Sequence, residues 1–314
     1  MILYIVIPCY NEEEALPISS EVISEKVRAL IAAGTISNKS RIMLVDDGSR
    51  DKTWDVITRL HGDNDLITGV KLSRNRGHQN ALLAGLMTAK EYCDAAVSID
   101  ADLQDDINAI DDMIEKYKAG CDVVYGVRSS REKDTFFKRN TALVFYKIMK
   151  KMGVDMVYNH ADYRLMSKRA LDGLEQFEEV NLFLRGIVPL IGYKYDFAEY
   201  ERGERVAGES KYPLSKMIAF AIQGITSMSI KPIRMITALG LFIFVASFVL
   251  LVYSLLMRFI GNVVPGWTSL MWSIWALGGL QMLSLGIIGE YVGKIYLETK
   301  KRPKFIIEAF LTKN

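Results

Sequence analysis

Short, continuous apolar runs alternate with helical patterns over the first part of the chain. The apolar runs lie at residues 2–7, 41–45, 66–72, 95–99 and 122–126. Runs of this form are typical of strands that are buried on both faces of a parallel sheet. The helical patterns between them, three of which are followed by a glycine, span residues 14–33, 51–61, 78–92 and 107–119. The alternation predicts an α/β fold, a mostly parallel sheet with helices on both of its faces.

The pattern changes toward the end of the chain, where two long runs contain no charged residue. They span residues 235–257 and 267–289, and each is long enough to cross a hydrocarbon core of about 30 Å as a helix. The segment between them, 258–266, contains a proline–glycine pair and predicts a short hairpin outside the cytoplasm. We therefore expect two transmembrane helices, because buried core helices, the alternative, seldom lack a polar face over such a length.

Basic residues flank both uncharged runs, whereas the hairpin carries only Arg258. The positive-inside rule then places both ends of the chain in the cytoplasm. We expect a cytoplasmic domain over 1–211, an amphipathic juxtamembrane segment over 212–234 and a basic cytoplasmic tail over 290–314. The start of the chain lacks the basic region of a signal peptide. The expected location is the cell membrane, as a multi-pass protein with its main domain in the cytoplasm.

Composition and charge narrow the class of protein. The 314 residues are 50% hydrophobic and 24% charged, which excludes a disordered chain. A formal net charge of +2 gives no reason to expect a nucleic-acid partner. Cys9, Cys93 and Cys121 lie far apart, so they form neither a disulfide framework nor a CxxC metal pair.

Polar clusters follow four of the predicted strands. They are PCYNEEE at 8–14, DDGS at 46–49, SRNRGH at 73–78 and DADLQDD at 100–106. Ligands of open parallel sheets bind at the carboxyl ends of the strands, so we expect these clusters to meet at one edge and form a site. A solvated loop with helix caps explains any one of them, but not all four together.

The last of these clusters has the chemistry of a metal site. Asp100 and Asp102 are two positions apart where a strand passes into a loop, so we expect both side chains on one side, with Gln104 next in the alternation. Such carboxylates suit Mg²⁺ or Mn²⁺, which proteins usually hold together with substrate phosphates. The pattern predicts a divalent-metal site and a phosphorylated substrate. No GxGxxG follows the first strand and no GxxxxGK[ST] occurs, which disfavours dinucleotide and P-loop sites.

Two other clusters leave alternatives open. A carboxylate of the Asp46–Asp47 pair can accept hydrogen bonds from a nucleotide base or ribose. The same pair precedes Gly48, and Asp-Gly is common in turns. His78 is interpreted as the start of a helix rather than as an acid–base catalyst.

The sequences VIPCYNEEE, LVDDGSRDKT, LSRNRGHQNAL and SIDADLQD, in this order, resemble those of family 2 glycosyltransferases with a GT-A (Rossmann-like) fold. From residue 2 to residue 211 the chain is similar to the polyprenyl-phosphate branch, which includes bactoprenol glucosyltransferases and dolichol-phosphate mannose synthases. The resemblance implies an inverting, membrane-bound enzyme that moves a hexose from a nucleotide sugar to undecaprenyl or another polyprenyl phosphate, for modification of cell-envelope glycans. It favours glucose from UDP-glucose, with UDP-N-acetylglucosamine and GDP-mannose as alternatives.

The resemblance also implies roles for single residues. Those expected to bind the nucleotide sugar are Pro8, Tyr10, Glu12, Asp47, Asp100, Arg205 and Lys211. Those expected to hold Mg²⁺ or Mn²⁺ are Asp100, Asp102 and Gln104, and those expected to face the acceptor phosphate are Arg128, Arg139 and Arg164. Asp162 and Asp102 are the candidate catalytic residues, and it stays open whether Asp162 is a base or only positions the acceptor.

The sequence also bears on three other classes of protein. A processive polysaccharide synthase normally has a QxxRW motif, and none of the tryptophans at 54, 267, 272 and 275 completes one. A transporter is disfavoured because the uncharged runs contain no ionisable pathway. A non-catalytic, membrane-tethered nucleotide-sugar-binding protein remains an alternative. Such a protein would not need the metal-binding carboxylates, so the presence of both Asp100 and Asp102 favours an enzyme. Formation of a homo-oligomer is left open.

Overall fold

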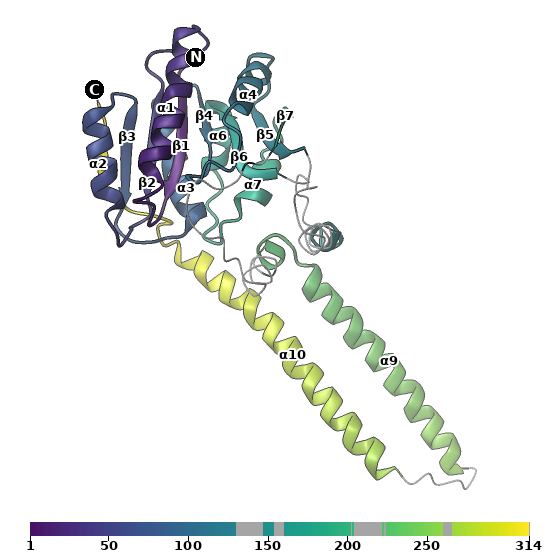
Figure 1. Cartoon of the computed structure of the whole chain (residues 1–314). Coiled ribbons are helices and arrows are strands. Elements are labelled where there is room, and N and C mark those ends of the chain that lie inside the picture. The colour runs from purple at the N-terminus through teal and green to yellow at the C-terminus, as the bar shows by residue number, and fades with distance from the viewer. Residues whose placement is uncertain are drawn as a thin grey trace.

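A computed structural model of the chain describes residues 1–129, 147–153, 160–201, 203, 222, 224–259 and 266–313. They form a sheet that is covered by helices and two long helices that extend away from it (Figure 1). The sheet domain carries all the candidate site residues that lie within the described ranges.

The sheet has eight strands in the described part of the chain, in the order β7-β5-β6-β4-β1-β2-β3-β8. The strands are β1 (Leu3–Cys9), β2 (Arg41–Asp46), β3 (Ile67–Leu72), β4 (Ala95–Ser98), β5 (Val123–Arg128), β6 (His160–Ser167), β7 (Tyr195–Tyr200) and β8 (Ile307–Leu311). Strands β4, β1, β2 and β3 pair in parallel, as do β5 and β7. The α/β sheet of the prediction is confirmed, but β6 and β8, which run antiparallel to their neighbours, were not predicted.

Helices cover both faces of the sheet, as the alternating pattern predicted. The helices are α1 (Leu16–Ala32), α2 (Thr53–Asp63), α3 (His78–Ala89), α4 (Ala109–Lys118), α6 (Lys168–Glu175), α7 (Leu184–Leu190), α9 (Lys231–Phe259) and α10 (Trp267–Lys300). Successive side chains of a strand point to opposite faces. Ile5 and Ile7 of β1 therefore join a buried core with α1, α2 and α4, whereas Tyr4 and Val6 join a second core with α3, α6 and α7.

The C-terminal segment returns to the sheet. Beyond α10, β8 pairs antiparallel with β3. The backbone N–H of Ser73 donates to the carbonyl of Ile306 at 3.0 Å, and Lys71 pairs with Glu308 at 2.9 Å. The prediction of a basic tail over 290–314 did not foresee this strand, because five residues carry too little pattern to identify an edge strand without its partner.

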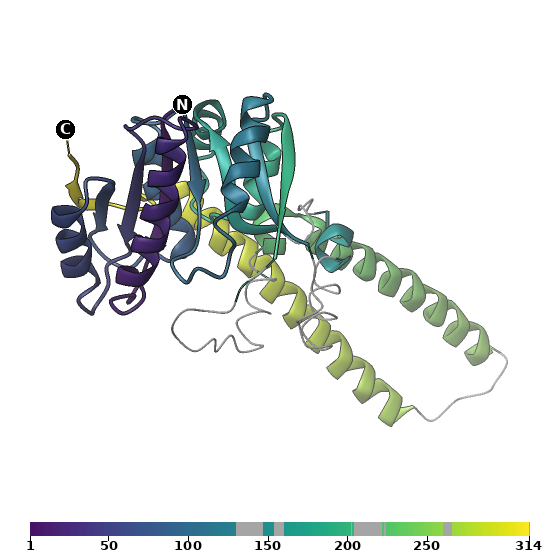
Figure 2. The same cartoon turned by 45° about the horizontal axis from the view of Figure 1, so that its top comes forward.

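Helices α9 and α10 extend side by side from the sheet domain (Figure 2). Among the helices of the described residues, none combines the length and the apolarity needed to cross a membrane. The predicted transmembrane helices over 235–257 and 267–289, and with them the multi-pass location, are therefore wrong. The prediction rested on the absence of charge, but an uncharged run can still be interrupted by glycine, serine, threonine and glutamine, as 267–289 is. Residues 212–221 and 223 of the predicted juxtamembrane segment, and residues 260–265 of the predicted hairpin, lie outside the described residues.

Gly48, in the loop after β2, is required by a close approach of two backbones. Its φ is +63°, and a Cβ atom there would lie 2.5 Å from the carbonyl carbon of Arg74. We expect Gly48→Ala to lower the free energy of unfolding by about 3 kcal/mol, because alanine disfavours this φ and would also displace the backbone of Arg74. Urea unfolding measures the change.

Gly62 is the matched control for this substitution. Nothing lies within 4 Å of the position of its Cβ atom, and it sits inside α2, where alanine is the better helix former by about 1 kcal/mol. We expect Gly62→Ala to leave the stability unchanged or to raise it. An equal loss in both variants would contradict the close approach at Gly48.

Candidate active site

The carboxyl ends of β1, β2, β3 and β4 lie at one edge of the sheet, because these strands are adjacent and parallel. We call this edge the rim. The four polar clusters of the sequence follow these strand ends, so the predicted meeting of the clusters is confirmed. Two rim residues with side chains, Asn11 and Leu103, have φ values of 55° and 51°. Such conformations are uncommon for residues other than glycine and concentrate at functional loops.

Asp47 holds the loop that follows β3. Its carboxylate accepts hydrogen bonds from the backbone N–H groups of Arg76 at 2.7 Å and Gly77 at 2.8 Å. Burial raises the pKa of Asp47, and these two hydrogen bonds oppose the rise. Asp46 accepts a bond from the N–H of Ser49 at 3.0 Å. Both carboxylates thus shape rim loops, and a contact between Asp47 and a nucleotide stays a prediction.

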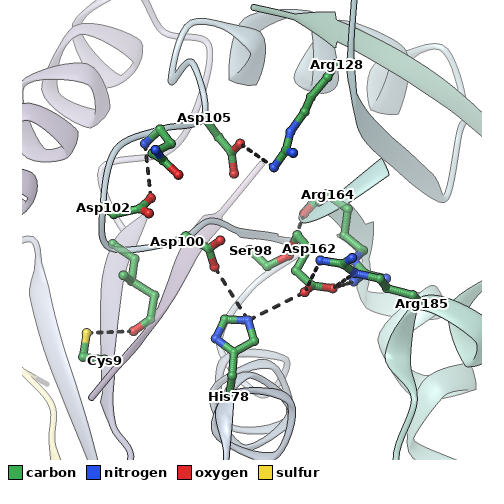
Figure 3. Close-up of polar contacts among 12 residues, drawn as sticks. Cys9, His78, Ser98, Asp100, Asp102, Asp105, Arg128, Asp162, Arg164 and Arg185 are labelled. Atoms are coloured by element: carbon green, nitrogen blue, oxygen red, sulfur yellow. Dashed lines mark hydrogen bonds and ion pairs between the residues drawn. The ribbon is translucent and has the colours of Figure 1, made fainter. Parts of the chain in front are cut away.

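His78 lies between two acids, one in the loop after β4 and one in β6 (Figure 3). Its Nε2 atom lies 3.6 Å from Oδ1 of Asp100 and 3.7 Å from Oδ2 of Asp162. Asp100 follows β4, Asp162 belongs to β6, and His78 is the first residue of α3. The prediction that His78 begins a helix is confirmed, but the sequence did not reveal its place between these carboxylates.

Asp162 is paired with two arginines. Its carboxylate lies 2.6 Å from Nη2 of Arg164, and it accepts hydrogen bonds from Nε of Arg185 at 3.3 Å and from Nη2 of Arg185 at 3.1 Å. Burial alone would raise the pKa of Asp162, but the guanidiniums of Arg185 and Arg164 outweigh it and hold that pKa well below the usual range. A carboxylate held ionised in this way is a weak base and a strong orienting group.

Arg164 is enclosed by protein, with only 2% of its side chain exposed. Its guanidinium is directed at Asp162, as Figure 3 shows. Arg185, by contrast, keeps 29% of its side chain exposed. The structure therefore gives Arg164 the position of a support for Asp162 rather than a surface position for an acceptor phosphate.

Asp100 and Asp102 supply the donor chemistry of a divalent-metal site at the rim. The protein around Asp100 raises its pKa to about 6 by desolvation, and neighbouring carboxylates add to the rise while His78 opposes it. A cation would relieve this crowding of negative charge. Within the described residues, no three His, Cys, Asp or Glu side chains are gathered to hold a metal ion alone. One or two carboxylates together with substrate phosphates are a usual ligand set for Mg²⁺, and a metal at Asp100 and Asp102 stays a prediction.

Gln104 and Arg128 belong to the neighbouring part of the rim. The backbone N–H of Gln104 donates to Asp102 at 3.2 Å, and the Gln104 carbonyl accepts from the N–H of Gly203 at 2.8 Å. Nη2 of Arg128 lies 4.0 Å from Asp105, and the hydroxyl of Tyr200 donates to the same carboxylate at 2.5 Å. Arg128 is thus near the acidic cluster, and its contact with an acceptor phosphate stays a prediction.

The remaining predicted site residues fall into two groups. Pro8 is buried at the end of β1, Tyr10 is 40% exposed beyond it, and Glu12 is partly buried with its N–H bonded to Thr53 at 2.9 Å. They stand at the rim on the β1 side. The other group lies outside the described residues: Arg139, Arg205 and Lys211.

Sequence reasoning missed Arg185. It lies in α7, far along the chain from the four rim clusters, and a lone arginine among apolar neighbours carries no motif. Only the pairing of β6 between β4 and β5 carries Asp162 to the place where α7 can reach it. The signal that could have pointed to Arg185 is the acid at 162 itself, since a buried carboxylate calls for a cationic partner.

A cavity of about 1030 Å³ lies elsewhere, between the segment 175–181, residues 226–233 and the end of α10. None of its lining residues is a predicted site residue. The candidate centre is therefore the open rim rather than this cavity.

Comparisons with known proteins identify the family of this chain. Glycosyl transferase family 2 matches residues 4–174. The chain is 53% identical over 307 residues to the glycosyltransferase YkoT of Bacillus subtilis (strain 168), covering 98% of this chain and 91% of that one. It is 40% identical over 310 residues to a prophage bactoprenol glucosyl transferase homolog of Escherichia coli (strain K12), covering 98% and 99%.

A looser likeness joins the chain to a solved structure, that of glucosyl-3-phosphoglycerate synthase from Mycobacterium tuberculosis with Mn²⁺ and uridine diphosphate. The TM-score is 0.43 at 16% identity, over 72% of this chain and 76% of the other. The family match covers more than half of the chain and includes the rim acids. This chain belongs to glycosyl transferase family 2 and is a glycosyltransferase.

Proposed function

We propose that the protein transfers a hexose from a nucleotide sugar to a polyprenyl phosphate, with glucose from UDP-glucose as the favoured donor. The observation that carries this proposal is the meeting of Asp100, His78 and Asp162 with Arg185 at the rim. Asp100 and Asp102 would serve the donor, and Asp162, which is paired with Arg185, would serve the acceptor. His78 contacts both Asp100 and Asp162. The similarity to a relative named as a bactoprenol glucosyl transferase homolog supports the choice of glucose and of a polyprenyl acceptor.

On the donor side, Asp100 and Asp102 would hold Mg²⁺ or Mn²⁺ against the diphosphate. A bound ion would neutralise the negative charge that develops on the departing nucleoside diphosphate. Gln104 shapes the loop that carries Asp102, and Asp47 fixes the adjacent loop through Arg76 and Gly77. Pro8, Tyr10 and Glu12 are proposed to complete the nucleotide pocket, together with Arg205 and Lys211.

On the acceptor side, a phosphate oxygen attacks the anomeric carbon, and the bond from that carbon to the diphosphate breaks. A phosphate monoester is largely ionised near neutral pH, with a second pKa of about 6, so the attack needs no strong base. Asp162 then orients the reacting groups as a fixed anion beside His78 and Arg185. Arg128 and Arg139 are proposed to meet the acceptor phosphate, because arginine matches phosphate oxygens with paired N–H donors.

The test is direct incubation of the purified protein with undecaprenyl phosphate in detergent micelles, Mg²⁺ and a panel of nucleotide sugars. Mass spectrometry of the lipid fraction is expected to show one added hexose with UDP-glucose. If a product forms only with UDP-N-acetylglucosamine or only with GDP-mannose, that nucleotide sugar is the donor and UDP-glucose is not. Absence of any glycosylated lipid, with sugar transferred to another acceptor class, would refute the polyprenyl proposal.

A further inference from the structure

Glu298, near the end of α10, is bonded to a loop of the sheet domain. Its carboxylate accepts hydrogen bonds from the backbone N–H of Val180 at 2.8 Å, the backbone N–H of Asn181 at 2.8 Å and the side-chain amide of Asn181 at 2.7 Å. Hydrogen bonds to an ionised acceptor are roughly twice as strong as neutral ones. Burial alone would raise the pKa of Glu298, but these three bonds outweigh it and lower that pKa. The carboxylate is therefore ionised at neutral pH.

The bonded loop leads directly into the candidate centre. Residues 180–181 precede α7, whose first residue, Leu184, donates its N–H to Oε1 of Gln79 at 2.8 Å. Gln79 is the neighbour of His78 in α3. The next residue of α7 is Arg185, which pairs with Asp162. The segment 180–185 is thus held at one end by α10 and at the other by α3, with Arg185 at its inner end.

At residues 180–181, dense packing does not replace the bonds of Glu298, whereas Leu182, Phe183 and Leu184, which follow them, are buried in the core. Val180, Asn181 and Glu298 all line the cavity of about 1030 Å³, so open space lies beside the contact. A loop bordered by a cavity can move when its hydrogen bonds are lost, whereas a close-packed loop cannot. A second bond in the same region, from Nζ of Lys304 to the carbonyl of Phe177 at 2.6 Å, holds the start of the loop.

We propose that Glu298 is a positioning residue for the reaction: by binding residues 180–181 it holds α7 in the register that sets Arg185 against Asp162. This inference rests on the proposed function, since it takes Asp162 to be part of the reacting centre. The end of α10 then has a role in catalysis although it touches no substrate. Small displacements of positioning groups can reduce a rate by about a hundredfold.

The test compares Glu298→Ala, Glu298→Gln and Glu178→Gln in the full-length protein. Glu178 is the matched control, because its pair with Lys301 at 3.5 Å is at the surface, with both side chains 80% exposed. We expect Glu298→Ala to reduce kcat by about thirtyfold with the KM for the nucleotide sugar changed less than about threefold. Glu298→Gln should recover part of the loss, because its amide oxygen still accepts from the loop N–H groups. Glu178→Gln should behave as the wild type.

A second measurement does not depend on activity. Hydrogen exchange of the peptide covering 178–192 should become faster in Glu298→Ala, with protection lost at 180–181 and also at α7, and the control should not change. In the Arg185→Lys variant, Glu298→Ala should lower kcat by a smaller factor than it does in the wild type. The reason is that both substitutions act on the same contact.

Three results would overturn the inference. They are a wild-type kcat in Glu298→Ala, exchange that is faster at 180–181 but unchanged in α7, and strict additivity with Arg185→Lys. Failure of the proposed function is separate, because the wild type itself would then glycosylate no polyprenyl phosphate. The exchange measurement would still decide whether Glu298 holds α7.

Discussion

Replacing Asp100 or Asp102 by asparagine is expected to reduce sugar transfer by about a thousandfold while the protein stays folded. Asparagine keeps the size of the side chain but removes the charge that would hold the cation against the donor diphosphate. Loss of one charge-stabilising group at a reacting centre typically costs about 10²–10³ in rate. For Asp100, folding should not suffer, because desolvation by the surrounding protein raises its pKa and so disfavours its charge. The measurement is kcat with saturating donor, beside a thermal unfolding curve.

The control for this prediction is Asp111→Asn. Asp111 is an exposed acid of α4 that pairs with Lys26 at 2.6 Å, and surface pairs of this kind contribute little to stability. EDTA should stop transfer by the wild type, and Mg²⁺ or Mn²⁺ should restore it. Full activity of either rim variant, or indifference of the wild type to the chelator, would contradict the metal assignment.

Asp162→Asn is expected to reduce transfer by about a hundredfold or more and to destabilise the protein. Removing one partner of a buried ion pair typically costs about 3 kcal/mol or more, because the remaining charge is left uncompensated. Here the uncompensated group would be Arg164, which is enclosed and has a buried Nη1 atom without a hydrogen-bond partner in the described part of the chain. Urea unfolding at neutral pH measures the loss of stability, and steady-state kinetics measures the loss of rate.

The pH dependence separates an orienting role of Asp162 from a role as base. The folded pKa of Asp162 is depressed below its ordinary value of 3.8, so its contribution to stability is complete above that value and is lost only as the pH falls toward the folded pKa. Asp162 contributes to the raised pKa of Asp100, so the comparison belongs above the pH range in which Asp100 titrates. The stability difference between wild type and Asp162→Asn should therefore be constant from about pH 7.5 to pH 9, within about half a kcal/mol, and shrink in acid. An orienting carboxylate also leaves the shape of the pH–rate profile unchanged in the variant.

A catalytic base would give the opposite outcome. If Asp162 took a proton in the reaction, the variant would lose the acid limb of the wild-type profile. Asp65→Asn is the control for both measurements, since Asp65 is 92% exposed and pairs with Lys313 at the surface. A destabilised control would indicate that the loss in Asp162→Asn reports general sensitivity to removal of acids rather than the buried cluster.

The sequence by itself determined the inner part of the sheet. The apolar runs at 2–7, 41–45, 66–72 and 95–99 match β1 to β4 within two residues at each end. A strand buried on both faces needs apolar residues throughout, and this requirement is visible without any knowledge of its partners. Because parallel strands place their carboxyl ends together, the same runs also predicted the rim and the meeting of its four polar clusters.

Only the tertiary structure decided which side chains lie next to the acids of the rim. Strand β6 contains His160, Asp162 and Arg164 among apolar residues, and no local pattern separates it from a loop. Its insertion between β4 and β5 brings Asp162 to His78 and Arg185, residues 84 and 23 positions away in sequence, respectively. Strand β8 and the contact of Glu298 arise in the same way. Pairing between distant segments depends on long-range packing, which leaves little trace in the order of neighbouring residues.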